Sequence, residues 1–390
     1  MKIQQLYKKY TLPTYKRVGP VFVRGRGSYI WDESGRRYLD FFPGWGVGIL
    51  GYSHPRIVEA MAKQAKELIF LPNNLYHKWQ ALLAEEIVKS SFPSRVFFAN
   101  SGAEAVEAAI KFSRLYGKGP RFEIIVMRNS FHGRTFGALS ATAQEKYKKP
   151  FRPLLASFKE AKFNDFSDFK RKVTKKTVAV LLELIQGEGG VNVAEKEYVE
   201  RVYQYCKKHN LLFIIDEVQT GMGRTARMFC YQHYEIKPDI MLLAKGLAAG
   251  VPISCMVVRK DIADIMGPGM HASTFGGNPF SSRIALEVFN IVKRERILER
   301  VRKNSRYLFR KFEEFRKEFS FIREVRGKGF MVGIELKMEA TPFFMEALKK
   351  GLIINATHKN VLRIMPALNI KIEDLNKGLR ILEEVFKRFS

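Results

Sequence analysis

The chain has 390 residues, of which 46% are hydrophobic and 27% are charged, a balance typical of a soluble globular protein. Lysine and arginine outnumber the acidic residues by 67 to 39, and the formal net charge of +28 raises the question of a nucleic-acid partner. No stretch has the apolar length of a membrane span, and three widely separated cysteines argue against a disulfide framework or a zinc site, so we expect a cytoplasmic protein without a metal ion.

The first 44 residues predict a polar segment followed by short strands. Residues 1–20 are basic and lack the apolar core of a signal peptide. The residue pattern of 20–42 predicts strands. We expect residues 1–44 to join a smaller domain built mainly from the C-terminal part of the chain.

Three glycines in the next stretch, Gly46, Gly48 and Gly51, match the GxGxxG pattern of dinucleotide-binding loops. A dinucleotide site also needs a helix that opens at the motif and an acidic residue at the end of the next strand. Here YSHP (52–55) comes before the helix, and the following LIFLPNN (68–74) contains no acid. We therefore interpret the glycines as a tight loop and not as part of a Rossmann oxidoreductase.

Short apolar runs alternate with helical segments between residues 95 and 260. The candidate strands are 95–100, 122–127, 177–184, 211–218, 239–245 and 254–259, with helices such as 104–117 and 195–209 between them. Strands that are apolar almost throughout predict a mostly parallel sheet with helices on both faces. Ligands bind beyond the carboxyl ends of such strands, so the residues that follow each strand form the candidate site.

The first of these strands continues as FFANSGAEAVEAA (97–109), in which Ser101 and Gly102 open an amphipathic helix. The first turn of a helix offers free N–H groups and the positive end of the helix dipole, an arrangement that binds phosphate. An ordinary serine N-cap explains the same residues. This stretch alone leaves both interpretations open.

The second and third strands also end in polar residues. NSFHGRTFGALS (129–140) places Phe131, His132 and Arg134 close together, and LELIQGEGG (182–190) holds Glu188 between glycines. A lone histidine is more often structural than catalytic, and a glycine-flanked acid fits a solvated loop equally well. Neither stretch identifies a site without the others.

The fourth strand, in LLFIIDEVQTGMGR (211–224), places Asp216 and Glu217 directly after five apolar residues. A carboxylate at that depth needs a partner or hydrogen bonds, although an acid solvated at the sheet edge is the alternative. The fifth, in DIMLLAKGLAAGVP (239–252), ends in Lys245, and lysine is rarely buried. Lys245 is either a surface residue or an amine that the strand delivers to a ligand.

The pattern of predicted elements changes after residue 280. Two long charged helices (280–319) come before a short strand region and a final helix. We expect a large domain over 45–265 that binds the cofactor and an α+β small domain over 266–390. Basic and acidic residues alternate in 292–319, which fits solvated helix faces better than a nucleic-acid groove. We therefore do not expect nucleic acid as a partner.

Together, the strand ends offer a candidate phosphate site, an aromatic ring, a buried acid and a lysine. Pyridoxal phosphate would use all four, because it needs an amine for a Schiff base, a carboxylate for its ring nitrogen, a phosphate cup and a flat surface against its ring. No zinc, P-loop or Ser/His/Asp interpretation explains as many of these positions.

The chain resembles the class-III (ω-amino acid) aminotransferases of pyridoxal-phosphate fold type I. The motifs that carry the resemblance are FIIDEVQTGMGRT (213–225), DIMLLAKGLAAGVPI (239–253), STFGGNP (273–279) and INATHKNVLR (354–363). The similarity extends from YLDFFPGWGVGILGYSHP to VLRIMPALNI, nearly the whole chain. It implies an α/β fold with a mostly parallel central sheet, helices on both faces and a smaller α+β domain.

The resemblance also implies a role for each cofactor-binding residue. Lys245 would form the Schiff base and move the proton of the substrate, and Asp216 would pair with the ring nitrogen. The remaining cofactor contacts would come from Ser101, Gly102 and Ala103 at the phosphate, Phe131 and Val218 on the two ring faces, Gln219 near the phenolic oxygen, His132, and Thr274 reaching the phosphate of a neighbouring subunit. The active unit is therefore expected to be a homodimer with shared sites.

The implied substrate contacts are mainly charged. Arg363 would hold the α-carboxylate of 2-oxoglutarate or glutamate, and Arg134 would hold the distal carboxylate of the substrate. Glu188 would pair with Arg363 when a donor without that carboxylate is bound, and Trp45 lies in a segment that contacts substrate in relatives.

We expect transfer of the δ-amino group of N-acetylornithine to 2-oxoglutarate by a ping-pong mechanism. Ornithine, succinylornithine, 4-aminobutyrate and a lysine-pathway amine are alternative donors, and a nucleic-acid-binding protein on the same fold is the alternative of a different class. Departures from the usual family wording, such as Ala103, Leu184, Ala367 and the loop GWGVGIL, concern substrate identity and not the chemistry.

Overall fold

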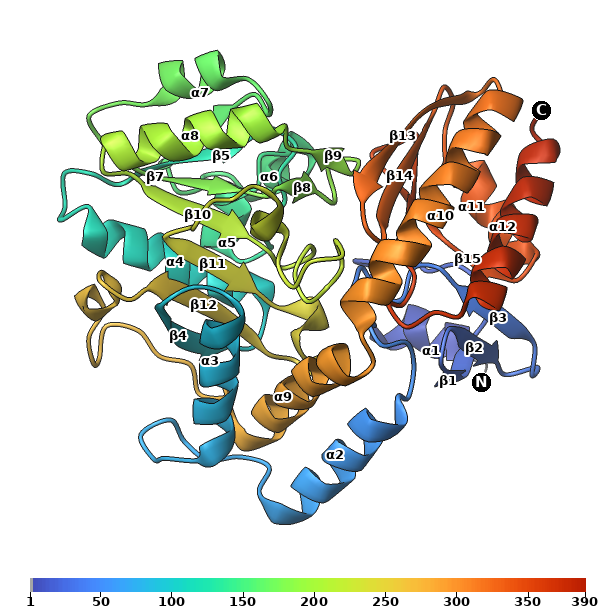
Figure 1. Ribbon diagram of the computed structural model, residues 1–390, viewed down its shortest axis with the longest axis horizontal. Coiled ribbons are helices and arrows are strands. Elements are labelled where there is room, and N and C mark those ends of the chain that lie inside the picture. Colours follow the sequence, from blue (N-terminus) through green and yellow to red (C-terminus); the bar gives the residue numbers. More distant parts are fainter. Residues whose placement is uncertain (1–2) are drawn as a thin grey trace.

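The computed structural model describes residues 3–390 and contains a large sheet in one lobe and two small sheets in the other (Figure 1). The seven strands of the large sheet follow the order β4 (Ser94–Ala99), β12 (Ser254–Arg259), β11 (Ile240–Leu243), β10 (Leu212–Asp216), β7 (Thr177–Leu182), β5 (Glu123–Met127) and β6 (Phe158–Ala161). All neighbours pair in parallel except at β12, which is antiparallel to both β11 and β4. The predicted mostly parallel sheet is confirmed.

All six predicted strands of this sheet form, and β5, β7, β10 and β11 are buried on both faces, whereas β4 at the sheet edge is partly exposed. Alternate residues of β10, for example, face two separate apolar clusters, with Phe213 and Ile215 in one and Leu212 and Ile214 in the other. The seventh strand, β6, was not predicted, since its sequence FKEA is half polar and it lies partly exposed at the sheet edge.

Helices cover both faces of the large sheet, as predicted. The apolar cluster on one face includes residues of α4 (Gly102–Tyr116) and α5 (Phe136–Ala141), and the cluster on the other includes residues of α7 (Phe166–Lys172) and α8 (Lys196–Lys208). A short helix, α6 (Glu145–Lys148), follows α5.

The second lobe contains two four-stranded sheets. One has the order β13 (Ile322–Lys328), β14 (Met331–Leu336), β17 (Val361–Ile364) and β16 (Asn355–Thr357), with every pair antiparallel. The other has the order β1 (Phe22–Arg26), β2 (Tyr29–Asp32), β3 (Arg37–Asp40) and β15 (Leu352–Ile353). Its parallel β3–β15 pair joins the N-terminal strands to the C-terminal part of the chain.

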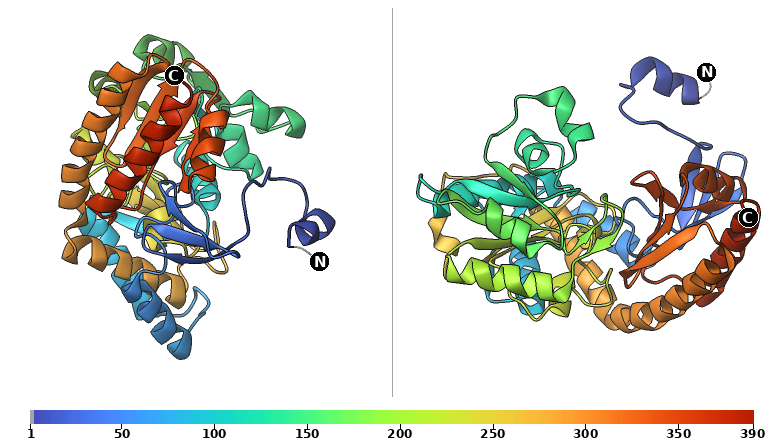
Figure 2. Two further views of the ribbon diagram at one scale, coloured as in Figure 1. Left: turned by 90° about the vertical axis from the view of Figure 1, so that its right-hand side faces the viewer. Right: turned by 90° about the horizontal axis from the view of Figure 1, so that it is seen from above.

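Helices α10 (Ile297–Glu318), α11 (Thr341–Lys349) and α12 (Ile372–Lys387) belong to this second lobe (Figure 1). Helix α1 (Ile3–Tyr10) stands away from the rest of the molecule and buries none of its residues (Figure 2). No helix among residues 3–390 is long and apolar enough to cross a membrane.

Two further helices, α2 (Pro55–Glu67) and α3 (Lys78–Ser90), both pack against α9 (Pro279–Arg294) near the large sheet (Figure 1). Helix α9 falls within the expected small domain by sequence number, although it packs beside α2 and α3, and the boundaries after 44 and 265 stay a prediction. The loop before α2 is tight: a Cβ on Gly51 would lie 2.4 Å from the carbonyl oxygen of Gly27. No helix opens at the GxGxxG glycines.

Candidate active site

A cavity of about 340 Å³ lies at the carboxyl ends of β7, β10 and β11 and at the start of α4. Ten of the predicted site residues line it: Ser101, Gly102, Ala103, Phe131, His132, Glu188, Asp216, Val218, Gln219 and Lys245. Residues that are up to 144 positions apart in the chain thus meet in one place because the parallel strands end at the same edge of the sheet.

Lys245 follows β11 and begins a single turn of 3-10 helix, Lys245–Ala248. Its φ of 45° lies in the left-handed region that a lysine rarely adopts, a feature common at functional sites. The Nζ atom makes no hydrogen bond or ion pair with any residue of the described chain. Burial lowers the pKa of the Lys245 amine, although Glu188 and Asp216 act against the shift, so the neutral nucleophilic form is more available.

Asp216 is the last residue of β10 and reaches the cavity wall beside His132. Its Oδ2 atom accepts a hydrogen bond from Nδ1 of His132 at 2.8 Å, and its Oδ1 atom accepts the N–H of Val218 at 3.0 Å. Burial lowers the pKa of His132, but the hydrogen bond and charge of Asp216 outweigh burial, and the pKa lies above its ordinary value. The carboxylate is therefore oriented by two donors at a position open to a ligand.

The start of α4 satisfies both interpretations of Ser101. Ser101 is the N-cap of a capping box, since its Oγ accepts the N–H of Glu104 and the Glu104 carboxylate accepts the N–H of Ser101 at 2.7 Å. The next two N–H groups, of Gly102 and Ala103, donate to no residue in the described part of the chain, and both residues line the cavity. Two free donors at a helix start form a site for an anionic group.

The cavity walls between these groups are apolar. Phe131 and Val218 both line it, and Gly133 lets the chain pass close to α4. Gly133 has a φ of 141°, and a Cβ there would lie 2.8 Å from the Cβ of Ala103. A side chain at position 133 would therefore push into the cavity wall.

Arg363 lies in β17, is fully buried and already has an ionic partner. Its Nη1 atom lies 2.7 Å from Oε1 of Glu188 and donates to the carbonyl of Gly187 at 2.9 Å, while Oδ1 of Asn355 accepts from its Nε and Nη2 atoms. The guanidinium also lies 4.8 Å from the ring centre of Phe42. Burial raises the pKa of Glu188, but Arg363 outweighs it and holds the pKa below its usual range.

Four predicted site residues are not part of the cavity lining: Arg134, Arg363, Trp45 and Thr274. Arg363 lies next to the cavity, because its partner Glu188 lines the cavity wall. Arg134 is exposed, stacks 4.0 Å above the Tyr147 ring and has no carboxylate partner within residues 3–390. Trp45 is 51% exposed and packs against Phe42, and Thr274 is exposed in a loop whose Ser273 Oγ accepts a bond from Asn100. Their predicted roles stay predictions.

Several residues at the site were not predicted from the sequence. Glu183 directly follows β7 and lines the cavity, and its Oε2 accepts the N–H of Phe131 at 2.9 Å. Burial and the nearby Asp216 raise its pKa to about 7, although His132 acts against them. The strand-end argument that found Asp216 applies equally to Glu183. Asn355 and Val47 gave no such signal, because Asn355 meets Arg363 through the pairing of β16 with β17 and Val47 lies in a loop.

The residues present fit pyridoxal phosphate. A lysine amine without a partner, a carboxylate oriented by two donors and two free N–H groups at a helix start share one cavity of suitable size. This combination, at the carboxyl edge of a mostly parallel sheet, defines an enzyme of the pyridoxal-phosphate class.

The family model "Aminotransferase class-III" matches residues 13–386, so the chain belongs to the class-III aminotransferases, which depend on pyridoxal phosphate. The aminotransferase activity and the cofactor predicted from the sequence are thereby confirmed at the level of the family.

Individual relatives are similar to this chain over nearly its full length. An acetylornithine aminotransferase of Caldanaerobacter subterraneus subsp. tengcongensis is 48% identical over 97% of both chains. An acetylornithine/succinyldiaminopimelate aminotransferase of Buchnera aphidicola subsp. Schizaphis graminum is 40% identical over 96% of this chain and 95% of its own. The structure of an ornithine aminotransferase from Toxoplasma gondii, described with partial occupancy of PLP at its active site, superposes with a TM-score of 0.95 at 30% identity, covering 99% of this chain and 93% of that one.

Proposed function

We propose that the enzyme transfers the δ-amino group of N-acetylornithine to 2-oxoglutarate, giving N-acetylglutamate semialdehyde and glutamate. The 48% identical relative named for acetylornithine supports this donor. The structural observation that carries the proposal is the Glu188–Arg363 pair, 2.7 Å apart, beside a Lys245 amine without a partner. That arrangement suits an enzyme that must accept two chemically different substrates in turn.

In this proposal the cofactor is held by residues from three elements. Bound pyridoxal phosphate supplies an aldehyde for the donor amine and a protonated ring that withdraws electrons from the reacting carbon. Lys245 would hold the cofactor and then move the proton at the substrate carbon that bears the amine. Asp216 would face the ring nitrogen, and the N–H groups of Gly102 and Ala103 would bind the phosphate, with Phe131 and Val218 on the ring faces.

The two substrates differ in the charge they bring to Arg363. 2-Oxoglutarate brings an α-carboxylate next to its reacting carbon, whereas N-acetylornithine reacts at its side-chain end and brings none. A buried guanidinium without a partner is costly. Glu188 would therefore neutralise Arg363 while the amine donor reacts and turn aside for 2-oxoglutarate, and Arg134 would hold the distal carboxylate of either substrate.

Other donors stay alternatives. The Buchnera relative named for succinyldiaminopimelate supports a lysine-pathway amine, and the Toxoplasma relative named for ornithine supports ornithine. Succinylornithine and 4-aminobutyrate are further candidates. Ornithine and succinylornithine differ from N-acetylornithine only at the α-nitrogen, far from the reacting amine, so contacts at that end of the substrate would decide between these three.

We also propose that the active unit is a homodimer in the cytoplasm. Apolar side chains are exposed on α1 and the residues after it, and on the connection from α2 to α3 with the neighbouring Phe275. Such surface supports contact with a second copy, which would bring Thr274 of one subunit to the phosphate of the other. Three free, buried cysteines support a reducing compartment.

Single-turnover spectroscopy tests the donor. The enzyme loaded with pyridoxal phosphate is mixed with N-acetylornithine, ornithine, succinylornithine or 4-aminobutyrate, and the loss of the visible band of the lysine-linked cofactor is followed. We expect N-acetylornithine to react fastest. A much faster reaction with ornithine or 4-aminobutyrate would overturn the proposed donor while leaving the aminotransferase chemistry intact.

A further inference from the structure

The turn that carries Glu188 has little support of its own. It joins β8 (Ile185–Gln186) to β9 (Asn192–Val193), two strands of two residues each. An isolated hairpin of this size is not stable in water. Val191, a β-branched residue, also adopts a φ of 59°, in the left-handed region that such residues avoid. Contacts from outside the hairpin must therefore fix the turn.

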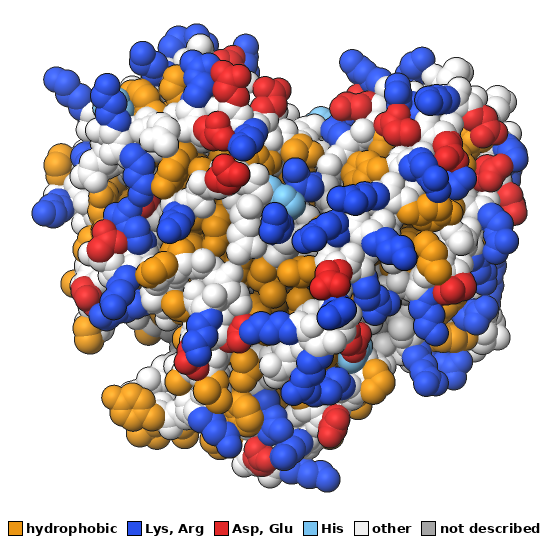
Figure 3. Space-filling view, viewed as in Figure 1, with side chains coloured by type: hydrophobic (Ala, Val, Ile, Leu, Met, Phe, Trp, Pro, Cys, Tyr) orange, Lys and Arg blue, Asp and Glu red, His pale blue; other side chains and the backbone are white. Residues whose placement is uncertain are grey.

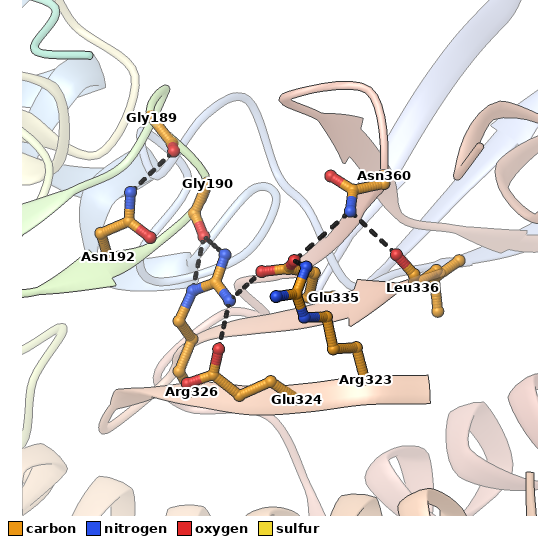
Figure 4. Close-up of polar contacts among 9 residues, drawn as sticks. All are labelled: Gly189, Gly190, Asn192, Arg323, Glu324, Arg326, Glu335, Leu336 and Asn360. Atoms are coloured by element: carbon orange, nitrogen blue, oxygen red, sulfur yellow. Dashed lines mark hydrogen bonds and ion pairs between the residues drawn. The ribbon is translucent and has the colours of Figure 1, made fainter. Parts of the chain in front are cut away.

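Four consecutive carbonyl groups of the turn accept hydrogen bonds from side chains, and the first, that of Gly187, accepts from Arg363 Nη1 at 2.9 Å. The carbonyl of Glu188 accepts from Thr357 Oγ1 at 3.4 Å, and that of Gly189 accepts from Asn192 Nδ2 at 2.9 Å. The carbonyl of Gly190 accepts two bonds from Arg326, from Nε at 3.0 Å and from Nη2 at 2.7 Å (Figure 4). Only the contacts of Gly187 with Arg363 and of Gly190 with Arg326 involve a charge, and charge-assisted bonds are the stronger ones.

Arg326 is itself held in one orientation. It lies on β13, and its Nη1 atom bonds to Glu324 at 2.7 Å and to Glu335 of β14 (Figure 4). Glu335 also accepts from Arg323 at 3.3 Å. Burial raises the pKa of Glu335, but its hydrogen bond and ion pair with Arg326 outweigh burial and hold the pKa below its usual range. The three nitrogens of Arg326 therefore each have a partner.

The same sheet carries Arg363. Strand β14 pairs with β13 on one side and with β17 on the other, and Gly333 of β14 lies opposite both Arg326 and Arg363. One rigid sheet thus holds the guanidinium that binds Glu188 and the guanidinium that fixes the backbone next to Glu188.

We propose that Arg326 is a positioning residue for Glu188, a role that rests on the proposed function of the Glu188–Arg363 pair. By holding the carbonyl of Gly190, Arg326 fixes the backbone of the turn relative to Arg363. Glu188 then releases and regains Arg363 by rotation of its side chain, and the turn does not move. The preference of the enzyme between its two substrates therefore depends on a residue that touches neither of them.

The kinetic test uses Arg326→Gln in the full-length enzyme loaded with pyridoxal phosphate. In a ping-pong mechanism, kcat/KM for each substrate reports its own half-reaction. The turn relaxes in the variant, and Glu188 no longer neutralises Arg363. We therefore expect kcat/KM for N-acetylornithine to fall about tenfold, which is the typical effect of losing a charged hydrogen bond. The value of kcat/KM for 2-oxoglutarate should change less than about twofold, since this substrate supplies its own carboxylate to Arg363. Glu188→Gln should shift the ratio in the same direction.

Arg323→Gln is the matched control, because Arg323 lies on the same strand and shares Glu335 but does not contact the turn. It should leave both values unchanged. Arg326→Lys keeps the charge with a single donor group and should give an intermediate ratio. It also serves if Arg326→Gln proves too unstable to purify. An equal fall in both half-reactions, or an effect of Arg323→Gln as large as that of Arg326→Gln, would overturn the proposal.

Hydrogen exchange of the holoenzyme gives a readout that does not depend on the donor. We expect the amides of 187–191, including the Val191 N–H that donates to Gln186 at 2.9 Å, to exchange several-fold faster in Arg326→Gln than in the wild type or Arg323→Gln. Unchanged exchange would contradict the proposal. If the wild type does not use N-acetylornithine but exchange changes as expected, the proposed donor fails and the positioning role stands.

Discussion

Lys245 and Glu183 reach the cavity from the ends of β11 and β7, on either side of Asp216 at the end of β10. Burial lowers the pKa of the lysine amine and raises the pKa of the Glu183 carboxyl to about 7. Both groups are thereby brought nearer to the neutral range, where proton transfer is most efficient. A lysine on the surface would be protonated and could not act as a nucleophile.

Arg134 should affect binding more than folding, because it is exposed and lacks a carboxylate partner among residues 3–390. In Arg134→Gln we expect the KM values of both substrates to rise about tenfold or more, since a charged hydrogen bond to the distal carboxylate is lost. Steady-state kinetics measure the change, and the melting temperature should not move. Arg128→Gln, another exposed arginine outside the cavity lining, is the control. Unchanged KM values in Arg134→Gln would contradict the assigned role.

Glu217 predicts a pH dependence of stability. It is 1% exposed, accepts the N–H of Tyr231 at 2.7 Å, and burial raises its pKa from 4.5 to about 7. The folded protein holds this proton more tightly than the unfolded chain, so the free energy of unfolding falls as the pH rises from 4.5 through 7. In Glu217→Gln this loss should disappear, an effect of up to about 3 kcal/mol.

Urea denaturation at pH 5 and pH 8 measures that effect. The free energy of unfolding of Glu217→Gln, minus that of the wild type, should be larger at pH 8 than at pH 5. Glu197→Gln, whose parent side chain is 81% exposed, should follow the wild type at both values. Equal pH dependence in Glu217→Gln and the wild type would show that Glu217 does not titrate in this range.

The elements of the site show what the sequence could and could not predict. Six strands of the large sheet were predictable because they are continuous apolar runs, and the polar residues at their ends identified Lys245, Asp216 and the start of α4. Strand β6 was not, because an edge strand can be half polar. The partners of Arg363 and Glu188 were partly predicted by family resemblance, but Asn355 and Arg326 were not. Asn355 lies opposite Arg363 in the β16–β17 pair, whose register the sequence does not fix, and no sequence pattern places Arg326 against the turn of the other lobe.

Gly102 at the start of α4 leaves little room for a side chain. A Cβ on Gly102 would lie 3.0 Å from Val218 Cγ1, closer than ordinary contact. In Gly102→Ala, Val218 must give way, and Val218 is the residue that we expect to lie against the ring. We expect the affinity for pyridoxal phosphate to fall by about 1–3 kcal/mol, the usual cost of overpacking, with little change in the stability of the apoprotein.

Equilibrium titration with pyridoxal phosphate measures this affinity. Gly267→Ala is the control, because a Cβ at position 267 would meet no atom within 4 Å. Wild-type affinity in Gly102→Ala would mean that the start of α4 and Val218 do not enclose the cofactor.

At the scale of the whole molecule, the large positive charge is dispersed. Figure 3 shows lysine and arginine spread over the visible face and interleaved with acidic side chains, without a single basic stripe. A dispersed positive potential attracts the anionic substrates and the phosphorylated cofactor of this family without a groove for nucleic acid. The expectation of no nucleic-acid partner stays a prediction.

The proposed dimer rests on exposed apolar surface. Leu68, Ile69 and Phe70 are exposed on the connection from α2 to α3, and the Phe70 ring lies 5.5 Å from that of Phe275, next to Thr274. We expect sedimentation analysis to give twice the chain mass of 45.0 kDa. Phe70→Glu should produce monomers with reduced affinity for pyridoxal phosphate, because Thr274 of the partner is lost. A wild-type monomer with full activity would contradict the shared site.

The central claim is that Lys245 holds pyridoxal phosphate, and borohydride reduction tests it most directly. Reduction converts a lysine-linked aldehyde cofactor into a stable secondary amine that peptide mass spectrometry can locate. We expect the loaded wild type to carry the reduced cofactor on Lys245 and Lys245→Ala to carry none. A reduced cofactor on another lysine, or no modification of the loaded wild type, would contradict it.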